Sequence, residues 1–223
     1  MAFPLSNDCI YMDQQTEQTR LLPDIVLVQH ILSGEKRFFE VIMRRYNQRL
    51  YRIGMSVLND DAETEDAMQA AYMKAYEHLA TFKQLSSFAT WLTRIMINEC
   101  LGRQKSRRRS PVDAAKPPDN KISLSTPMQD LMNKELSTML ETAIAGLPEQ
   151  YRTVFILREI EELSIRETGQ VLDITEANVK VRLNRAKTML LGELKGYIKG
   201  HVYAFHLTRC DRIIAAVMGK INT

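Results

Sequence analysis

The residues best suited to chemistry lie on a predicted helix that Thr175 caps. Asn178, Arg182 and Arg185 share one face of this helix, flanked by Lys180 and Val181. The opposite face carries apolar residues at helical spacing: Val179, Leu183, Ala186 and Leu190. An arginine can donate two hydrogen bonds to guanine, and an asparagine can pair with adenine. The pattern indicates a helix that reads the DNA major groove. An ordinary trihelical unit with a solvated basic face remains the alternative.

Two shorter helices are predicted to position this one. The first follows Gly146 and Pro148, with an apolar stripe of Tyr151, Val154, Phe155 and Ile160. The second opens with a capping box from Ser164 to Glu167, in which side chain and backbone satisfy each other's polar groups. Asp173 then tolerates the left-handed backbone of a tight turn. Helix, tight turn and polar-faced helix is the layout of a helix-turn-helix.

The composition is that of a globular, all-helical protein. The 223 residues are 45% hydrophobic and 26% charged, and the alternation typical of strands is scarce. The formal net charge is only +3, so nucleic-acid binding would depend on local basic patches.

Cysteine usage and hydropathy point to the cytoplasm. Cys9, Cys100 and Cys210 are far apart and odd in number, which argues for reduced thiols and against a disulfide framework. No apolar run approaches the roughly 20 residues of a membrane span, and no signal peptide is apparent. We therefore expect no membrane insertion.

Pattern shifts divide the chain into two helical domains joined by a flexible linker. A flexible leader, 1–23, precedes a four-helix domain at 24–109. The proline-containing segment 110–127 is the linker, 128–196 holds the helix-turn-helix, and 197–223 is an extension.

The first domain is expected to contain helices at 24–32, 35–58, 61–79 and 88–104, with a loop at 80–87. The inward residues of the second helix are Phe39, Ile42, Met43, Tyr46, Leu50, Ile53 and Val57. Asp24 could cap the first helix, and 59–61 should end the second and begin the third. In the second domain, Leu140 and Ile144 are expected inward on a helix at 128–145, together with Leu131, Met132 and Leu136.

A cationic run closes the fourth helix of the first domain. Residues 103–109 hold five positive charges and no negative one, directly after Arg94 and Asn98. Such a run can follow a nucleic-acid backbone beside aromatic and hydrogen-bonding groups, or it can be a solvated tail. The residues alone leave both readings open.

The two domains together resemble the extracytoplasmic-function group of bacterial sigma factors. The marks of its region 2 are Arg45-Tyr46, Asp61-Ala62-Glu63, Glu65-Asp66, Gln69, Phe82, Ser87-Phe88, Trp91-Leu92, Arg94-Ile95 and Asn98. The marks of its region 4 are Leu147-Pro148, Arg152, Val154-Phe155, Leu157-Arg158, Leu163-Ser164, Val179 to Leu183 and Arg185-Ala186. The chain departs from the family at Ala70, where glutamate is usual, at Asp173, where glycine is common, and at Val181, where serine is common.

The resemblance implies a non-catalytic subunit that directs RNA polymerase to promoters, often in stress responses. It implies capture of the single-stranded −10 element by Lys83, Ser86, Ser87, Arg94, Asn98, Arg103 and Arg107. It implies reading of the −35 element by Asn178, Lys180, Val181, Arg182 and Arg185. Contact with the polymerase clamp is expected through Arg49, Asp61, Asp66, Gln69 and Met73, and the second domain is expected at the flap. An anti-sigma factor is implied as a further partner, and no cofactor is expected.

The alternatives to a sigma factor are a conventional regulator and an enzyme acting on nucleic acid. A conventional helix-turn-helix regulator with a helical sensor domain would share the recognition helix, but would usually dimerise. An enzyme acting on nucleic acid is disfavoured, because the sequence has no phosphate-binding glycine loop and no nucleophile signature.

The extension raises a separate question about metal binding. His206 and Cys210 are four residues apart, with His201 nearby, so they could share a helix face. Structural zinc takes four ligands, and this set lacks one. We therefore predict no metal site, and expect these residues to pack or to serve a redox or regulatory tail.

Overall fold

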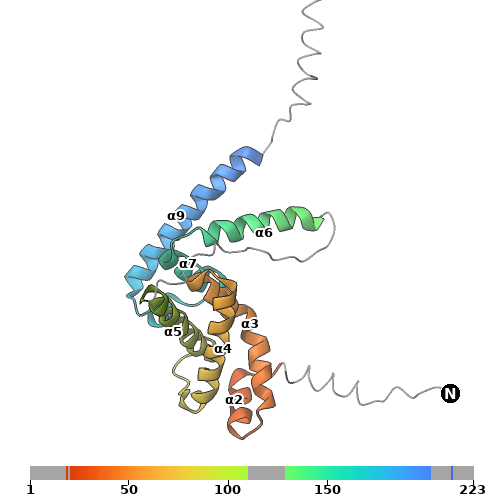
Figure 1. Ribbon diagram of the computed structural model, residues 1–223, viewed down its shortest axis with the longest axis vertical. Helices are drawn as coiled ribbons and strands as arrows, with labels where there is room; N and C mark the ends of the chain where they lie inside the picture. The colour runs from red at the N-terminus through yellow and green to blue at the C-terminus, as the bar shows by residue number, and fades with distance from the viewer. Residues whose placement is uncertain (1–18, 20, 110–128, 202–211, 213–223) are drawn as a thin grey trace, which may run out of the picture.

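The computed structural model describes residue 19 and residues 21–109, 129–201 and 212. Within these ranges the chain is helical and contains no strand, as the sequence predicts. Figure 1 shows the helices from α2 to α5 as a bundle, with α7 against it and with α6 and α9 extending away. We refer to residues 24–109 as the first half and to residues 129–201 as the second half.

The first half is built around α3. Its elements are α2 (Asp24–Leu32), α3 (Arg37–Leu58), α4 (Asp61–Glu77), η1 (Leu79–Thr81) and α5 (Phe88–Arg109). α3 packs against α2, α4 and α5, and it buries Ile42, Leu50 and Ile53 completely. The prediction of Phe39 as a core residue is wrong in one detail, because Phe38 takes the fully inward position. Phe39 is half-buried, with its ring edge-on to the rings of Tyr72 and Tyr76.

Short polar residues set the joints of the first half. Asn59 ends α3 in the left-handed conformation, with φ of 53°, and the Asp60 carboxylate accepts the backbone N–H of Glu63 at 3.0 Å. These two features confirm the predicted boundary. Asp24 does not cap α2 as expected. Its carboxylate instead accepts hydrogen bonds from Arg45 and from the Tyr46 hydroxyl, and so ties the start of α2 to α3.

The second half follows the predicted helix-turn-helix order. Its elements are α6 (Gln129–Ala145), α7 (Glu149–Phe155), η3 (Ile156–Ile160), α8 (Ile165–Leu172) and α9 (Glu176–His201). The capping box of Ser164 and Glu167 is present, and Asp173 has the predicted left-handed conformation, with φ of 54°. The turn is tight enough that a Cβ on Gly169 would lie 2.8 Å from the carbonyl oxygen of Ile174. Glycine at this position therefore lets α8 and α9 approach closely.

Two residues predicted to face inward in the second half are exposed. Ile160 is 41% exposed, because the helix changes to the wider π form at Ile156 and its side chains no longer follow the α-helical period. Leu140 is 38% exposed, because α6 contacts the rest of the second half mainly through Ala143 and Ile144 near its end.

The two halves pack directly against each other. α3 contacts α7 and η3, and α5 contacts α8. Leu157, Leu163 and Val171 of the second half join the core of the first, whereas Leu147, Ala186 and Leu190 form a smaller cluster of their own. Among the described residues, the larger core therefore crosses the two halves, and the second half keeps a smaller cluster of its own.

Several predictions fall on parts of the chain outside this description. Most of the leader, the linker and most of the extension, including His206 and Cys210, lie there, as do the side chains of Leu131, Met132 and Leu136. The predicted boundary at residue 196 falls inside α9, which continues to His201. Among the described helices, none combines the length and the apolar character that a bilayer crossing requires.

Candidate nucleic-acid interface

The N-terminal part of α9 presents the predicted reading face. The Thr175 hydroxyl accepts the backbone N–H of Asn178 at 3.3 Å, which confirms the cap at the start of this helix. Asn178, Lys180, Val181 and Arg185 are exposed, and Arg182 is half-buried. The structure thus brings all five predicted −35 residues onto one short segment of a single helix.

Hydrogen bonds hold both guanidinium groups of this face in place. Arg182 donates from Nε to the amide oxygen of Asn178 at 3.0 Å, and Arg185 donates from Nη1 to the hydroxyl of Tyr151 at 3.0 Å. The predicted roles of Asn178 and Arg182 are therefore linked, because the asparagine oxygen that would accept from a base is engaged by the arginine. Tyr151 was assigned only to the apolar stripe of α7, and its polar contact depends on tertiary structure.

A group of aromatic rings braces the loop before α5. Phe82, Phe88 and Trp91 lie with ring centroids 5.3 to 5.4 Å apart, so both ends of the loop are fixed on one cluster. Between these ends Lys83 and Leu85 are exposed, and Gln84 has φ of 56° in the left-handed region. The loop therefore projects a cation and an apolar side chain from a rigid base.

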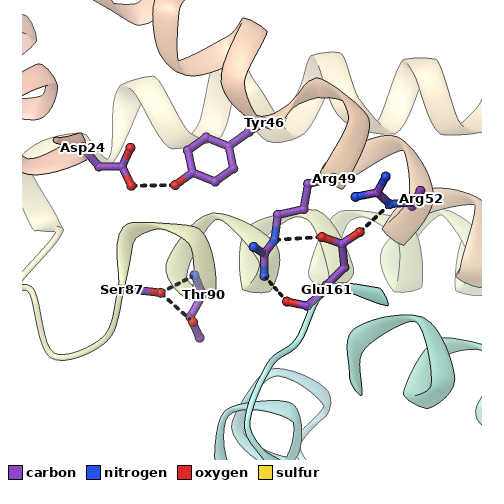
Figure 2. Close-up of polar contacts among 7 residues, drawn as sticks. All are labelled: Asp24, Tyr46, Arg49, Arg52, Ser87, Thr90 and Glu161. Atoms are coloured by element: carbon purple, nitrogen blue, oxygen red, sulfur yellow. Dashed lines mark hydrogen bonds and ion pairs between the residues drawn. The ribbon is translucent and has the colours of Figure 1, made fainter. Parts of the chain in front are cut away.

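The serines of this loop differ in their availability. The Ser87 hydroxyl caps α5, because it accepts the backbone N–H of Thr90 at 3.1 Å and lies 2.8 Å from the Thr90 hydroxyl (Figure 2). Ser86 makes only a long 3.4 Å hydrogen bond to the Ser87 carbonyl. Of the two, Ser86 is thus the freer donor.

The cationic run at 103–109 is part of α5 and not a tail. Because the helix continues, Lys105 lies on the same ridge as Arg94 and Asn98, and all three are exposed. Arg107, also exposed, lies on the opposite side of the helix from this ridge. The predicted DNA-binding residues do not include Lys105. Extending the helical period through the run would have placed it on the face of Arg94 and Asn98.

Arg103 turns toward acidic groups of its own half. Its guanidinium lies 3.2 Å from Glu99, 3.7 Å from Glu63 and 3.8 Å from Asp66. Burial of Glu99 opposes its ionisation, but the hydrogen bond and charge of Lys74, together with Arg103, lower the pKa of this carboxyl. Arg103 is therefore largely neutralised locally, whereas Lys105 is exposed on the ridge of Arg94 and Asn98.

The residues predicted to contact polymerase fall into two places. Gln69 and Met73 line an open groove of about 520 Å³ between α3 and α4, together with Phe39, Met43, Asn47 and Tyr72. Met73 is 60% exposed. Asp61 and Asp66 are exposed on the same helix as Gln69, and Asp61 accepts a hydrogen bond from Tyr51. Burial, followed by the Asp61 contact, raises the pKa of Tyr51 to about 12.

Arg49 lies apart from this groove, at the contact between the halves. Its side chain is 21% exposed and lies against Glu161 of the second half, which also binds Arg52 (Figure 2). Glu161 and Arg52 carry no assignment from the sequence, because neither belongs to a local motif. Their proximity arises only when the two halves pack.

The described residues hold no cluster of three or more possible metal ligands. Cys100 is buried, and burial raises the pKa of its thiol to about 12. Its thiolate is therefore suppressed at neutral pH, which makes it an inert core residue.

Comparison with known families matches both halves in order. Residues 42–110 match the family described as Sigma-70 region 2, and residues 137–190 match Sigma-70, region 4. The two families cover the loop, the α5 ridge and the recognition helix described above.

Curated relatives extend across most of the chain. The ECF RNA polymerase sigma factor SigW of Bacillus subtilis is 29% identical over 179 residues, covering 75% of this chain and 95% of the relative. The ECF RNA polymerase sigma-E factor of Escherichia coli K12 is 28% identical over 187 residues, covering 80% and 97%.

Solved structures agree on the fold. The sigma factor RpoE of Bartonella quintana, in complex with the anti-sigma factor NepR, has a TM-score of 0.58 at 22% identity, covering 70% of this chain and 96% of that one. CnrH, in complex with the cytosolic domain of CnrY, has a TM-score of 0.52 at 22% identity, covering 77% and 96%. The family matches and the relatives lead to one conclusion: the chain belongs to the sigma-70 family, as an extracytoplasmic-function sigma factor that gives RNA polymerase its promoter specificity.

Proposed function

We propose that the two halves read two promoter elements, with α9 in the major groove of the −35 element and the loop before α5 on the single-stranded −10 element. The observation that carries this assignment is the placement of exposed cationic residues on two separate helices, α5 and α9. α9 presents Arg182 and Arg185, whose forked donors suit guanine O6 and N7. Val181, 49% exposed beside them, offers an apolar contact for a thymine methyl group.

At the −10 element, the loop before α5 and the α5 ridge would contact different parts of the extruded strand. Splaying a base out of the duplex costs a few kcal/mol, which contacts to the extruded strand must offset. Lys83 and Ser86 on the loop, with Arg94 and Asn98 on the ridge, would contact the extruded nucleotides. Lys105 on this ridge would contact the phosphates, where a neutralised charge releases counterions.

Binding to core polymerase is assigned to the groove between α3 and α4, with Asp61, Asp66, Gln69 and Met73 at or beside it. The second half would contact the flap. An anti-sigma factor is a further proposed partner, because the sigma factor RpoE of Bartonella quintana, which has a similar fold, is in complex with the anti-sigma factor NepR. We place this activity in the cytoplasm, without catalysis or a cofactor.

A conventional regulator remains the other candidate class, but no observation favours it. The match to region 2 and region 4 in one chain is the arrangement of a sigma factor. A conventional regulator would bind its operator tightly without polymerase.

The test is in vitro transcription with purified core polymerase and a pool of promoters. The chain should create new start sites that share −35 and −10 elements. Arg182→Ala with Arg185→Ala should reduce initiation at these sites by at least about 30-fold, since each bidentate contact contributes roughly 1–3 kcal/mol and both are lost. Arg37→Ala, an exposed arginine at the start of α3, is the control and should retain full activity. Tight operator binding without core, and no new start sites with it, would reject the proposal.

A further inference from the structure

The contact between the halves contains a buried carboxylate. The Glu161 side chain is only 4% exposed, and it lies between two arginines of α3 (Figure 2). Arg52 donates from Nε to Glu161 Oε1 at 2.5 Å, and the Arg49 Nε lies 3.5 Å from Oε2. Arg49 also donates to the Glu161 backbone carbonyl at 3.3 Å. A carboxylate this deeply buried is stable only with such partners, and both partners belong to the other half.

The backbone around Glu161 is unusual on both sides. The π-helical turn Ile156–Ile160 ends directly before it, and Glu162 directly after it is left-handed, with φ of 57°. π-helical turns occur frequently at functional sites, and a left-handed non-glycine residue persists where surrounding contacts hold it. The local backbone is thus shaped to direct Glu161 toward α3.

A second set of contacts satisfies the end of α3. Arg152 and Thr153 both donate to the carbonyl oxygen of Ser56, at 2.8 and 3.1 Å. Ser56 lies in the last turn of α3, where carbonyl groups lack partners within the helix and where a positive charge is favourable. On the neighbouring helix, the Thr90 hydroxyl donates to Glu167 at 2.8 Å. The second half therefore contacts both α3 and the first turn of α5.

This packing is incompatible with reading both promoter elements at once. The names of the −35 and −10 elements place them about 25 base pairs apart, which is roughly 85 Å of duplex at 3.4 Å per base pair. In the packed chain α5 and α8 are in hydrogen-bond contact through Thr90 and Glu167. α8 has eight residues, about 12 Å of helix, and the turn after it leads into α9. The two reading surfaces are therefore several times too close together.

The chain is long enough to open. Nineteen residues, 110–128, separate α5 from α6, and a chain of that length can span at most about 65 Å. The packed state also contains a defect, because the Arg49 Nε is buried without a hydrogen bond. An unsatisfied buried donor weakens the state that contains it.

We propose that Glu161, held between Arg49 and Arg52, is a latch that keeps the free chain in a packed, self-inhibited state. Opening the latch separates the two reading surfaces and exposes Arg49, one of the residues predicted to face polymerase. The inhibitory part of this inference rests on the proposed function, in which one chain reads both elements. The latch itself can be measured without DNA or polymerase.

The distance between the halves tests the latch. Spin labels at Glu77→Cys on α4 and Lys195→Cys on α9, in the full chain with Cys9→Ser and Cys210→Ser, report it by double electron–electron resonance. Glu161→Gln should populate longer distances, and Glu161→Arg should make them dominant. Glu159→Gln is the matched control, since Glu159 pairs with Lys187 inside the second half at 3.0 Å. Adding Arg52→Glu to Glu161→Arg should restore part of the short distance.

Binding to core polymerase tests the inhibition. If the packed state cannot bind, the apparent dissociation constant scales with the inverse of the open fraction. Glu161→Gln and Glu161→Arg should therefore bind core about three- to tenfold more tightly than the parent chain, and Glu159→Gln should not.

Unchanged distances in both Glu161 variants, with native helical content, would overturn the latch. Longer distances without tighter binding would overturn the self-inhibition. A third outcome separates the two proposals. If the distances shift as expected but neither the parent nor any variant initiates transcription, the proposed function is rejected and the latch is still supported.

Discussion

The two halves of this chain differ in how they are stabilised. The first half encloses its own core, in which Ile42, Leu92 and Met96 are fully buried and aromatic rings brace the loop before α5. The second half divides its buried residues between a small cluster of its own and the core of the first half. The first half thus encloses its core by itself. The second half depends on its neighbour for part of its burial.

Core truncations should give the largest and most asymmetric effects. Leu92→Ala in the first half should cost about 2–5 kcal/mol of unfolding free energy. It should also destabilise the second half, because loss of the first half uncovers Leu157 and Val171. Leu190→Ala should destabilise only the second half. Hydrogen exchange followed by mass spectrometry, resolved by segment, measures both effects. If each substitution destabilised only its own half, and by a similar free energy, the second half would not depend on the first.

Tyr151→Phe tests whether the hydroxyl of Tyr151 on α7 positions Arg185 of α9. The substitution keeps the ring and removes only the hydroxyl that Arg185 contacts. We expect a loss of about three- to tenfold in discrimination at the −35 base that Arg185 reads, since a hydrogen bond to a charged group contributes roughly 1.5–3 kcal/mol when buried and less when exposed. Affinities of the polymerase complex for a series of −35 variants measure this effect. Binding to a single-stranded −10 oligonucleotide is the internal control and should not change.

The α5 ridge allows a matched comparison within the first half. Lys105→Ala should weaken binding of the polymerase complex to a −10 single strand about threefold and reduce the slope of log affinity against log salt by about 0.7. Arg103→Ala should leave that slope unchanged, because Arg103 is already paired with carboxylates, and should instead lower the melting temperature. The reverse result would place Arg103 on the DNA and Lys105 in solvent.

The smallest effect concerns Glu167, which joins the capping box to the contact between the halves. Hydrogen bonds from the Ser164 side chain and backbone lower the pKa of this carboxyl below its ordinary value. Its charge therefore stabilises the folded chain fully above about pH 4.5, and this stabilisation is lost as the pH falls through the lowered pKa. Glu167→Gln should cost less than about 1 kcal/mol at pH 7, after allowance for solvent screening.

Thermal unfolding of Glu167→Gln and the parent chain across pH 3 to 7 measures this difference. The two curves should converge at the acidic end. A difference that is constant with pH would show that the charge of Glu167 has no part in it.

Much of the local structure could be predicted because it depends on neighbours in the chain. The capping box at Ser164, the left-handed Asp173 and the Asp60 cap each involve groups within a few residues, and all three are present. The apolar period located the helices for the same reason. It also placed the five predicted −35 residues on one segment, since residues close on a helix stay close whatever else the chain does.

The sequence by itself therefore determined an all-helical chain, its helix-turn-helix and the helix segments that carry the residues predicted to contact DNA. Tertiary structure decided which of those residues are free. It paired Arg103 with carboxylates, used Ser87 as a cap, added Lys105 to the ridge and turned Ile160 outward through a π-helical turn. It alone brought Glu161 to Arg49 and Arg52, more than 100 residues away along the chain. Contacts at such separation follow from packing of whole helices, which no local pattern of residues encodes.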